Sequence, residues 1–544
     1  MPNYTNSVWS ETEPAPRHPP LSGDTTADVA IIGGGLTGVT AALLLQRAGQ
    51  RVALIESRRI GKGETGKTTA HLSLVLDTRY RTLISRFGAD GARLAAEGHR
   101  AAIERIARFS EEEAIRCDFR RVPGFLYAER PEEKEELVHE AEAVRRLGIA
   151  ATLTEDVPLP FKTALGLKFE DQAAFHPRAY LQALADAFVA AGGAIYEETH
   201  ATDIEEGEPC RVVTERGVLS ASRVIVAAHV PVSNRVMLHT KLAAYRSYAV
   251  GIEMPFSTDA LFWDLADPYH YTRLQRIDGR TYVIVGGEDH KVGDTDDTAT
   301  PFERLEDYVL SHFDREVAPT DYRWSGQIVE SVDGLAYVGR NALSSRIFVA
   351  TGYSGNGMTW ATLAAMVLAD QVREKKNPWS DLLDATRIKP LASAKAFVAE
   401  NVDFPKTLVK DRVPLPGLEA LGEIPAGEGH VLSVRGNRLA VYRNGNGELS
   451  AVSAVCTHLG CLVRWNTTEK SWDCPCHGSR FDPHGRILNG PAITGLEVRP
   501  LPIDEPETEE RAAASAARKR GGQESPATSS GGHRADGGRE GSGG

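Results

Sequence analysis

For a chain of 544 residues, this sequence is short of cysteine, of long apolar runs and of basic charge. No stretch provides the roughly 18 consecutive apolar residues that a membrane-spanning helix needs. Lys and Arg number 62 against 74 Asp and Glu, and this balance of −12 argues against general binding of nucleic acid or of acidic membrane surfaces. The N-terminal residues have neither the basic start nor the apolar core of a secretory signal. We therefore expect a cytoplasmic protein with no transmembrane segment and no nucleic-acid partner.

The six cysteines are unevenly spread, and four of them lie within the 21 residues 456–476. A chain of this length can bury a large core without a local covalent staple. The four clustered cysteines therefore indicate a chemical role rather than the cross-linking of a small fold. Cys117 and Cys210 stand alone in the sequence, and we expect them to be free thiols.

The N-terminal part has the order strand, glycine turn, helix, strand and acid. The apolar strand 28–32 runs into Gly33, Gly35 and Gly38, which match the pattern G-x-G-x-x-G. The first glycine permits a tight turn, the second lets a pyrophosphate approach the backbone, and the third lets the helix pack against the strand. Glu56 ends the second strand, where it can accept hydrogen bonds from ribose hydroxyls. This order predicts a dinucleotide site at the N-terminus of the first helix.

A second glycine-rich turn, residues 352–357, lies far downstream between a predicted strand, 346–351, and a predicted helix, 358–372. Its backbone N–H groups can face the edge of an isoalloxazine ring, although an ordinary strand–turn–helix joint is the alternative interpretation. An acid at the end of the second strand fits FAD and NAD alike, and the second turn favours FAD. No other G-x-G-x-x-G follows the first, which argues against a reductase that takes electrons from NAD(P)H.

On the fingerprint, the loop 63–70, the strand ending at Gly287 and the downstream turn, residues 27–375 resemble the D-amino-acid oxidase/glycine oxidase family of FAD-dependent oxidoreductases. The resemblance implies an α/β Rossmann-like FAD-binding domain with an inserted, mostly antiparallel substrate sheet. It also implies that the loop and the turn lie against FAD. The expected cofactor-binding residues are Gly33, Gly35, Leu36, Thr37, Gly38, Glu56, Thr68, Thr69, Gly352, Gly355, Asn356 and Gly357.

Catalytic side chains are hard to identify, because in such enzymes the flavin carries the chemistry and the protein orients the substrate. A substrate carboxylate would need an arginine in the covering sheet to hold it as a bidentate pair. Arg246 and Arg273 are the candidates, with a strand-face arginine as the alternative interpretation for each. His71 and His290 lie near the family segments and are weaker candidates.

The cysteine cluster combines Cys456-x-His458 with Cys474-x-x-His477. Two thiolates and two imidazoles suit a [2Fe–2S] centre in which one iron has two Cys ligands and the other has two His ligands. The same four side chains can also hold a tetrahedral zinc ion, although a Cys-x-His half is unusual for a structural zinc site. The residue types alone leave both metals open.

Residues 414–504 resemble Rieske [2Fe–2S] domains of the cytochrome bc type, down to the later turn 489–492. The resemblance implies that Cys456 and Cys474 bind one iron and that His458 and His477 bind the other. It also implies a disulfide between Cys461 and Cys476, which is unexpected in a reducing cytosol.

This sequence departs from the high-potential Rieske pattern at one position. Such domains place a Ser and, two residues on, a Tyr as hydrogen-bond donors to the sulfurs. Ser479 is present here, but Phe481 has no hydroxyl. With fewer donors to the sulfurs, we expect a midpoint potential below the top of the Rieske range of roughly −150 to +300 mV.

These patterns divide the chain into five parts. Residues 505–544 contain no Leu, Ile, Val, Met or aromatic residue, and such a composition predicts disorder. Within the flavoprotein we expect FAD-binding segments at about 27–88, 170–235 and 325–375, and substrate-domain segments at about 89–169 and 236–324. The expected parts are a flexible N-terminus (1–26), an FAD-dependent oxidoreductase (27–375), a bridge (376–413), a small all-β Rieske domain (414–504) and a disordered tail (505–544).

The sequence therefore predicts an oxidoreductase with two cofactors, FAD and a [2Fe–2S] cluster. We expect FAD to oxidise a small substrate, such as an amine or an amino acid, by hydride transfer. The cluster would then pass single electrons to an external acceptor, either a protein or a quinone. Two alternatives remain: an electron carrier or redox sensor with no turnover of its own, and reverse flow from a donor through the cluster to FAD.

Overall fold

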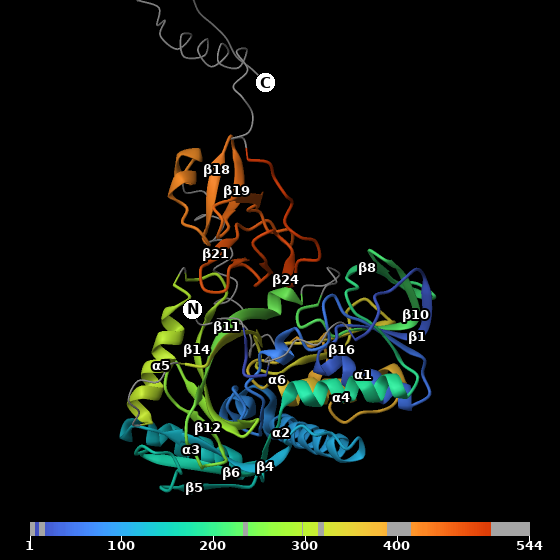
Figure 1. Ribbon diagram of the computed structural model, residues 1–544. Coiled ribbons are helices and arrows are strands. Elements are labelled where there is room, and N and C mark those ends of the chain that lie inside the picture. Colours follow the sequence, from blue (N-terminus) through green and yellow to red (C-terminus); the bar gives the residue numbers. More distant parts are fainter. Residues whose placement is uncertain are drawn as a thin grey trace, which may run out of the picture. The chain divides into compact units, whose positions relative to one another are not determined.

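The computed structural model describes residues 6–9, 17–231, 238–295, 297–313, 320–388 and 415–501. Four sheets organise this part of the chain, with eight, nine, three and four strands (Figure 1). The two large sheets belong to the N-terminal flavoprotein part and the two small ones to the C-terminal β part. The expected tail, 505–544, and most of the expected bridge, 389–413, lie outside the described residues.

The first sheet is the α/β core and has the strand order β16-β17-β10-β1-β2-β7, with β8 and β9 joined to the edge of β10. β1 pairs in parallel with both β2 and β10. Every residue of β2 and β17 is buried, as expected for parallel strands covered on both faces. The strands are β1 (Thr25–Ile32), β2 (Val52–Ile55), β7 (Ala194–Tyr196), β8 (Ala201–Glu205), β9 (Cys210–Thr214), β10 (Gly217–Val226), β16 (Tyr337–Arg340) and β17 (Ile347–Thr351).

The second sheet is the covering sheet, and it has the order β15-β11-β14-β13-β12-β4-β6-β3, with β5 paired to β6. Its neighbours are antiparallel except for β4 and β12, which run parallel. The inserted, mostly antiparallel sheet is therefore present as predicted. The strands are β3 (His71–Leu72), β4 (Arg120–Ala128), β5 (Ala151–Thr154), β6 (Leu165–Ala174), β11 (Leu242–Glu253), β12 (Leu261–Asp264), β13 (His270–Ile277), β14 (Arg280–Lys291) and β15 (Tyr322–Ser331).

Helices cover these sheets, and α1 packs between α4 and α6. α1 and α6 are buried along most of their length because they are apolar on nearly all sides. The α-helices are α1 (Leu36–Arg47), α2 (Tyr80–Glu112), α3 (Lys134–Arg146), α4 (Pro177–Ala190), α5 (Thr300–His312), α6 (Gly357–Val372) and α7 (Ser380–Leu383). The 3₁₀ helices are η1 (Glu64–Gly66), η2 (Pro131–Glu133), η3 (His239–Lys241) and η4 (Leu418–Glu423).

The C-terminal β part has a three-stranded sheet, β18-β19-β20, and a four-stranded sheet, β21-β22-β23-β24, as expected for a small all-β module. Its core packs Trp472 and Phe481 against the cysteines of the cluster. The strands are β18 (Gly429–Val434), β19 (Asn437–Arg443), β20 (Leu449–Ser453), β21 (Arg464–Asn466), β22 (Ser471–Asp473), β23 (Arg480–Phe481) and β24 (Ile487–Asn489).

The N-terminal residues differ from the expected flexible lead-in. Val8 and Trp9 are buried, and the Trp9 indole donates to the carbonyl of Thr68 at 2.7 Å. Leu21 is buried as well. These few apolar side chains attach the N-terminal segment to the protein. The average composition of the segment is polar and does not predict this attachment.

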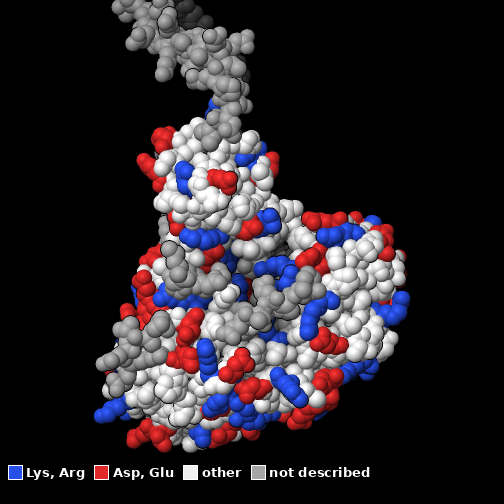
Figure 2. All heavy atoms as spheres, viewed as in Figure 1, with Lys and Arg blue, Asp and Glu red and all other residues white. Residues whose placement is uncertain are grey.

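Charged side chains of both signs are interspersed over the face seen in Figure 2. Among the described residues, no helix is long and apolar enough to cross a membrane.

Candidate functional site

Most of the residues expected to bind FAD line one cavity of about 1140 Å³. Its walls come from the fingerprint (32–37), the loop 63–69, the downstream turn (353–358), the covering sheet, and residues between 482 and 498 of the C-terminal β part. All the predicted cofactor residues line this cavity except Gly38 and Gly352. The structure thus brings together segments that lie hundreds of residues apart.

The fingerprint glycines have distinct structural reasons. Gly33 has φ +112°, and a Cβ there would lie 2.5 Å from the carbonyl oxygen of Ala227 on the neighbouring strand. A Cβ on Gly38 would lie 2.0 Å from the carbonyl oxygen of Gly33, so only glycine lets α1 approach the strand. A Cβ on Gly35 would meet only the Thr65 hydroxyl, at 3.3 Å, so this stretch of backbone stays open to the cavity. The turn is therefore shaped for a ligand that contacts the backbone.

Glu56 lies beside this turn at the end of β2. Its carboxylate accepts from the backbone N–H groups of Gly34 at 2.7 Å and Arg58 at 2.8 Å. The Ser57 hydroxyl donates to it as well, at 3.3 Å. A carboxylate has about four lone-pair sites, so three protein donors leave capacity for a ribose hydroxyl. The residue thus fits the role expected from the sequence.

The downstream turn is tied to the fingerprint helix by a hydrogen bond of 2.9 Å between the hydroxyls of Tyr353 and Thr37. Asn356 fixes the turn, because its side chain accepts from the Asp77 N–H at 2.9 Å and donates to the Val75 carbonyl at 3.0 Å. Neither α1 nor α6 has a side-chain cap or an acidic residue in its first turn. The Thr65 hydroxyl accepts from the first amide of α1, that of Leu36, at 3.2 Å. Two helix N-termini thus meet one cavity, which suits the pyrophosphate and the flavin ring of FAD.

The loop 63–70 is anchored from behind by Arg273. This buried guanidinium donates to the carbonyls of Thr69 at 3.1 Å and Ala70 at 2.7 Å. Ala70 has φ +61°, a left-handed conformation that costs free energy for an L-residue unless its surroundings hold it. Arg273 thus positions the backbone beside Thr68 and Thr69.

The second candidate arginine, Arg246, is also buried and lies elsewhere. Its guanidinium donates to both carboxylate oxygens of Glu469 at 2.6 Å and to the Ser325 hydroxyl. Among the described residues that line the cavity, neither Arg246 nor Arg273 appears. The geometry therefore gives neither arginine direct access to a substrate carboxylate.

A different set of side chains forms the end of the cavity under the covering sheet. The rings of Trp263 and Tyr271 lie 5.1 and 5.6 Å from that of His71, and Tyr269 lies 5.9 Å from Tyr271. Burial, followed by the nearby Arg273, lowers the pKa of His71 to about 3, so this imidazole is neutral. We call this the aromatic end, and it consists of His71, Ser247, Trp263, Tyr269, Tyr271 and Asp77.

Apart from His71, no local motif marks these residues as members of a site. A signal for them in the sequence is the density of Tyr in residues 240–290, which also fits the strands of a sheet.

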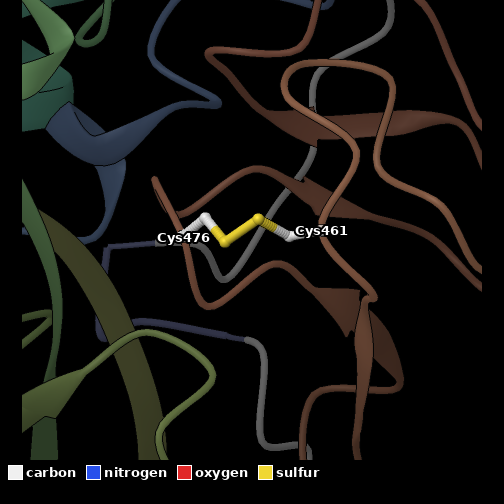
Figure 3. The surroundings of a disulfide bond; sticks show 2 residues. All are labelled: Cys461 and Cys476. Atoms are coloured by element: carbon white, nitrogen blue, oxygen red, sulfur yellow. A yellow bond between two sulfur atoms is a disulfide. The ribbon is translucent and has the colours of Figure 1, made fainter. Parts of the chain in front are cut away.

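Two loops of the C-terminal β part carry the predicted cluster ligands and share one backbone pattern. In the first, the Cys456 N–H donates to Cys461 O at 2.8 Å and the Gly460 N–H donates to Cys456 O at 3.0 Å. In the second, the Cys474 N–H donates to Ser479 O at 2.8 Å and the Gly478 N–H donates to Cys474 O at 3.0 Å. A disulfide between Cys461 and Cys476 joins the loops (Figure 3). The two loops thus present their ligands in matching frames.

The two imidazoles are in the state that a metal centre needs, and the two thiols are in hydrogen-bond contact. A hydrogen bond from the Cys474 thiol lowers the pKa of Cys456, and the same contact raises the pKa of Cys474. Burial lowers the pKa of His477 to about 4 and also lowers that of His458. The two imidazoles, with ring centres 5.0 Å apart, are therefore neutral, as metal coordination requires. The donor set fits a cluster with two Cys and two His ligands.

The flavoprotein residues contact this β part at the loop that carries His477. The side-chain N–H of Gln327 donates to the carbonyl of Gly478 at 2.7 Å, and Gln327 itself lines the cavity. The amide of Asn489 donates to Glu64 at 2.8 Å. The Arg246–Glu469 pair lies in the same contact, where Glu469 also accepts from Arg480 at 2.9 Å.

Comparison with known proteins agrees with both halves of this arrangement. The sequence model described as FAD dependent oxidoreductase matches residues 28–371, and the one described as Rieske [2Fe-2S] domain matches residues 418–500. The Bacillus subtilis protein YhfW, named as a Rieske 2Fe-2S iron-sulfur protein, is 35% identical over 90% of this chain and 97% of its own length.

Two further relatives match the flavoprotein part. The γ-glutamylputrescine oxidoreductase of Escherichia coli is 29% identical over 69% of this chain and 90% of its own length. The glycine oxidase structure from Geobacillus kaustophilus has a TM-score of 0.57 and 21% identity, and it covers 67% of this chain and 99% of its own. That structure shows a shared fold. The chain therefore belongs to the FAD dependent oxidoreductase family, and it combines an FAD-dependent oxidoreductase with a C-terminal Rieske [2Fe–2S] domain.

Proposed function

We propose that this enzyme oxidises a small substrate, an amine or an amino acid, at its flavin and passes the electrons singly through its Rieske cluster to an external acceptor. When bound, FAD would accept a hydride from a substrate C–H bond, which leaves an iminium ion, and the cluster would carry one electron at a time. The acceptor must take two single electrons in each turnover, as a redox protein or a quinone does. The cytoplasmic location expected from the sequence stays a prediction.

The observation that carries this proposal is the position of Gln327. One side chain lines the flavin cavity and also bonds to Gly478, the residue that follows the cluster ligand His477. A Cβ on Gly478 would lie 2.3 Å from Ala244 and 2.5 Å from Gln327, so this approach depends on glycine. A continuous path therefore runs from the cavity wall through the Gln327 side chain, across one hydrogen bond to Gly478, and along the backbone to His477.

We assign the cofactor roles to residues as the sequence suggested. Gly33, Gly35 and the start of α1 would bind the pyrophosphate, and Glu56 the ribose. The downstream turn would lie along the flavin. The cluster would be held by Cys456, His458, Cys474 and His477.

Anaerobic titration of the purified protein, with both cofactors in place, tests the proposal. A panel of amines and amino acids is added while flavin absorbance and the EPR signal of the reduced cluster are recorded together. A substrate of the enzyme should bleach the flavin and generate the cluster signal. Bleaching with no cluster signal would contradict electron transfer to the cluster, and a panel in which nothing bleaches the flavin would favour a carrier or sensor.

A further inference from the structure

We propose that the substrate is a cationic amine with no carboxylate beside the reacting nitrogen. Asp77 and the rings of the aromatic end receive its ammonium group, and Asp289, bonded to Tyr269 outside the cavity lining, adds negative charge without contacting it. This inference rests on the proposed function, because it concerns the substrate of that same cavity. It separates amines from amino acids, which the proposed function leaves together.

Two carboxylates give the aromatic end of the cavity a negative charge. Asp77 lines the cavity and accepts from the N–H of Gly355 in the downstream turn. Asp289 accepts from the Tyr269 hydroxyl at 3.0 Å. Each carboxylate lies within electrostatic range of the other and of both Tyr269 and Tyr271. Two negative groups therefore converge on the same pair of rings.

The protein neutralises the negative charge of Asp77 and Asp289 only in part. Oδ1 of Asp289 is buried and makes no well-aligned hydrogen bond in the part of the chain that the structure describes, although the Ser247 hydroxyl is near enough to lower the pKa of this carboxyl. Burial nevertheless raises the pKa of Asp289 to about 6 and also raises the pKa of Asp77, on which the Arg79 guanidinium acts while bonded to the Leu76 carbonyl. Buried carboxylates with so few donors cost free energy, and a cation bound at Asp77 would lower that cost.

The positively charged side chains that line the cavity lie away from its aromatic end. Among the described residues, the Lys and Arg side chains that line the cavity are Arg58, Lys67 and Arg486. Arg58 adjoins Glu56, and Arg486 belongs to the C-terminal β part. Lys67 lies 3.8 Å from Glu64 and within electrostatic range of Glu469 and Arg480, on the side of the contact with that part. None of the three belongs to the aromatic end.

The rings complete the arrangement. Trp263, Tyr269 and Tyr271 offer aromatic faces, and a face of this kind attracts an ammonium group within about 6 Å of its centre. His71 between them is neutral and does not repel a cation. A carboxylate placed here would instead meet negative charge, and no arginine lines this end, because the buried Arg273 guanidinium beyond His71 is bonded to the carbonyls of the loop 63–70. The chemistry of the aromatic end thus selects an amine over an amino acid.

Equilibrium binding to the holoenzyme under anaerobic conditions tests this inference. The probes are butylammonium and butyrate, which share a chain length and differ in charge, with tetramethylammonium as a probe that cannot be oxidised. Binding is followed by the perturbation of flavin absorbance. We expect both cations to bind and butyrate to bind at least about tenfold more weakly. Equal binding, or tighter binding of butyrate, would overturn the inference.

Variants locate the effect. Asp77→Asn should raise the dissociation constant of tetramethylammonium about tenfold, the loss expected for one charged contact, and Asp289→Asn should raise it by less, because Asp289 acts from outside the cavity lining. Asp259→Asn is the matched control, because Asp259 is a part-exposed carboxylate that pairs with Arg120 and lies outside the cavity lining. Wild-type affinity in Asp77→Asn would contradict the assignment.

Flavin content and melting temperature identify a misfolded variant, and the two wild-type probes then decide the question alone. Binding requires no electron transfer. Amine binding without cluster reduction would therefore defeat the proposed function and leave this inference standing. Cluster reduction driven by amino acids alone would do the reverse.

Discussion

Gln327 donates its side-chain N–H to the carbonyl of Gly478 at 2.7 Å, and its backbone N–H donates to Glu64 at 2.6 Å. One residue of β15 thus bonds both to the loop 63–70 and to the loop that carries His477, the proposed cluster ligand. We propose this relationship as the structural basis for coupling the flavin and the cluster.

Replacing Gln327 should slow electron transfer between the centres while both cofactors stay bound. Gln327→Leu removes the donor to Gly478 and leaves a buried carbonyl unsatisfied, which costs about 1–3 kcal/mol. Stopped-flow mixing with a reducing substrate should show normal flavin bleaching and delayed cluster reduction. Gln182→Leu is the control, because Gln182 is a half-buried residue of α4 whose amide donates to Asp186 and which lies outside the cavity lining. An undelayed cluster signal in Gln327→Leu would count against a role for this contact.

The residue at position 481 should set the cluster potential. Phe481 is fully buried in the core that also contains Cys456 and Cys474. Phe481→Tyr adds a hydroxyl that can donate to a cluster sulfur, which stabilises the reduced cluster and raises the midpoint potential. Ser479→Ala removes such a donor and should lower it. Redox titration followed by EPR measures both, and potentials equal to the wild-type value would contradict the expectation.

Glu469 should make the stability of the protein sensitive to acid. Burial alone would raise the pKa of this carboxyl, but Arg246 and Arg480 outweigh it and bring the pKa to about 2. A pKa depressed from the ordinary 4.5 means that this stabilisation is complete above about pH 4.5 and is lost as the pH falls toward 2. Glu469→Gln should cost about 3–5 kcal/mol at neutral pH, because it leaves buried guanidinium groups without a counter-charge.

Melting temperature against pH measures this effect. The difference between wild type and Glu469→Gln should shrink below about pH 4.5. Glu497→Gln, which breaks an exposed pair with Arg499, should melt like the wild type at every pH. A constant difference across the acid range would argue against the Glu469 carboxylate as its source.

Arg273 should determine FAD affinity through the loop 63–70. Arg273→Lys cannot reach the carbonyls of Thr69 and Ala70 together, so Ala70 loses the support of its left-handed conformation. We expect FAD to dissociate at least about tenfold more readily, as measured by reconstitution of the apoprotein. The exposed Arg276→Lys is the control. An unchanged FAD affinity in Arg273→Lys would show that the loop holds its shape without the guanidinium.

The sequence predicted the fold well where local pattern and tertiary role coincide. The strand ending at Ile32 and the helix after the downstream turn lie within a few residues of where the sequence predicts them. Gly88, with φ +74°, breaks α2 into two helical parts. α5 has a start signal in Thr300-Pro301-Phe302-Glu303, with Pro in the first turn, but the polar stretch before it hides its amphipathic pattern.

The same distinction between local motifs and long-range contacts applies to the candidate site. Cluster ligands and fingerprint glycines are local motifs, so their positions are visible in the sequence. The aromatic end is not local: Asp77, Trp263 and Tyr271 come from separate segments that meet only when the covering sheet closes over the flavin domain. Arg246 and Arg273 looked suited to a substrate because sequence cannot distinguish a buried anchor from a ligand-binding side chain.

Freeze-quench EPR during a single anaerobic turnover tests the central claim most directly. The holoenzyme is mixed with an amine that bleaches its flavin, and the reduced-cluster signal is counted against time. The account predicts that the cluster signal rises as the flavin gives up electrons, and that Cys456→Ser bleaches without any such signal. A wild-type cluster that stays oxidised while the flavin remains reduced would contradict the claim that the two centres form one electron path.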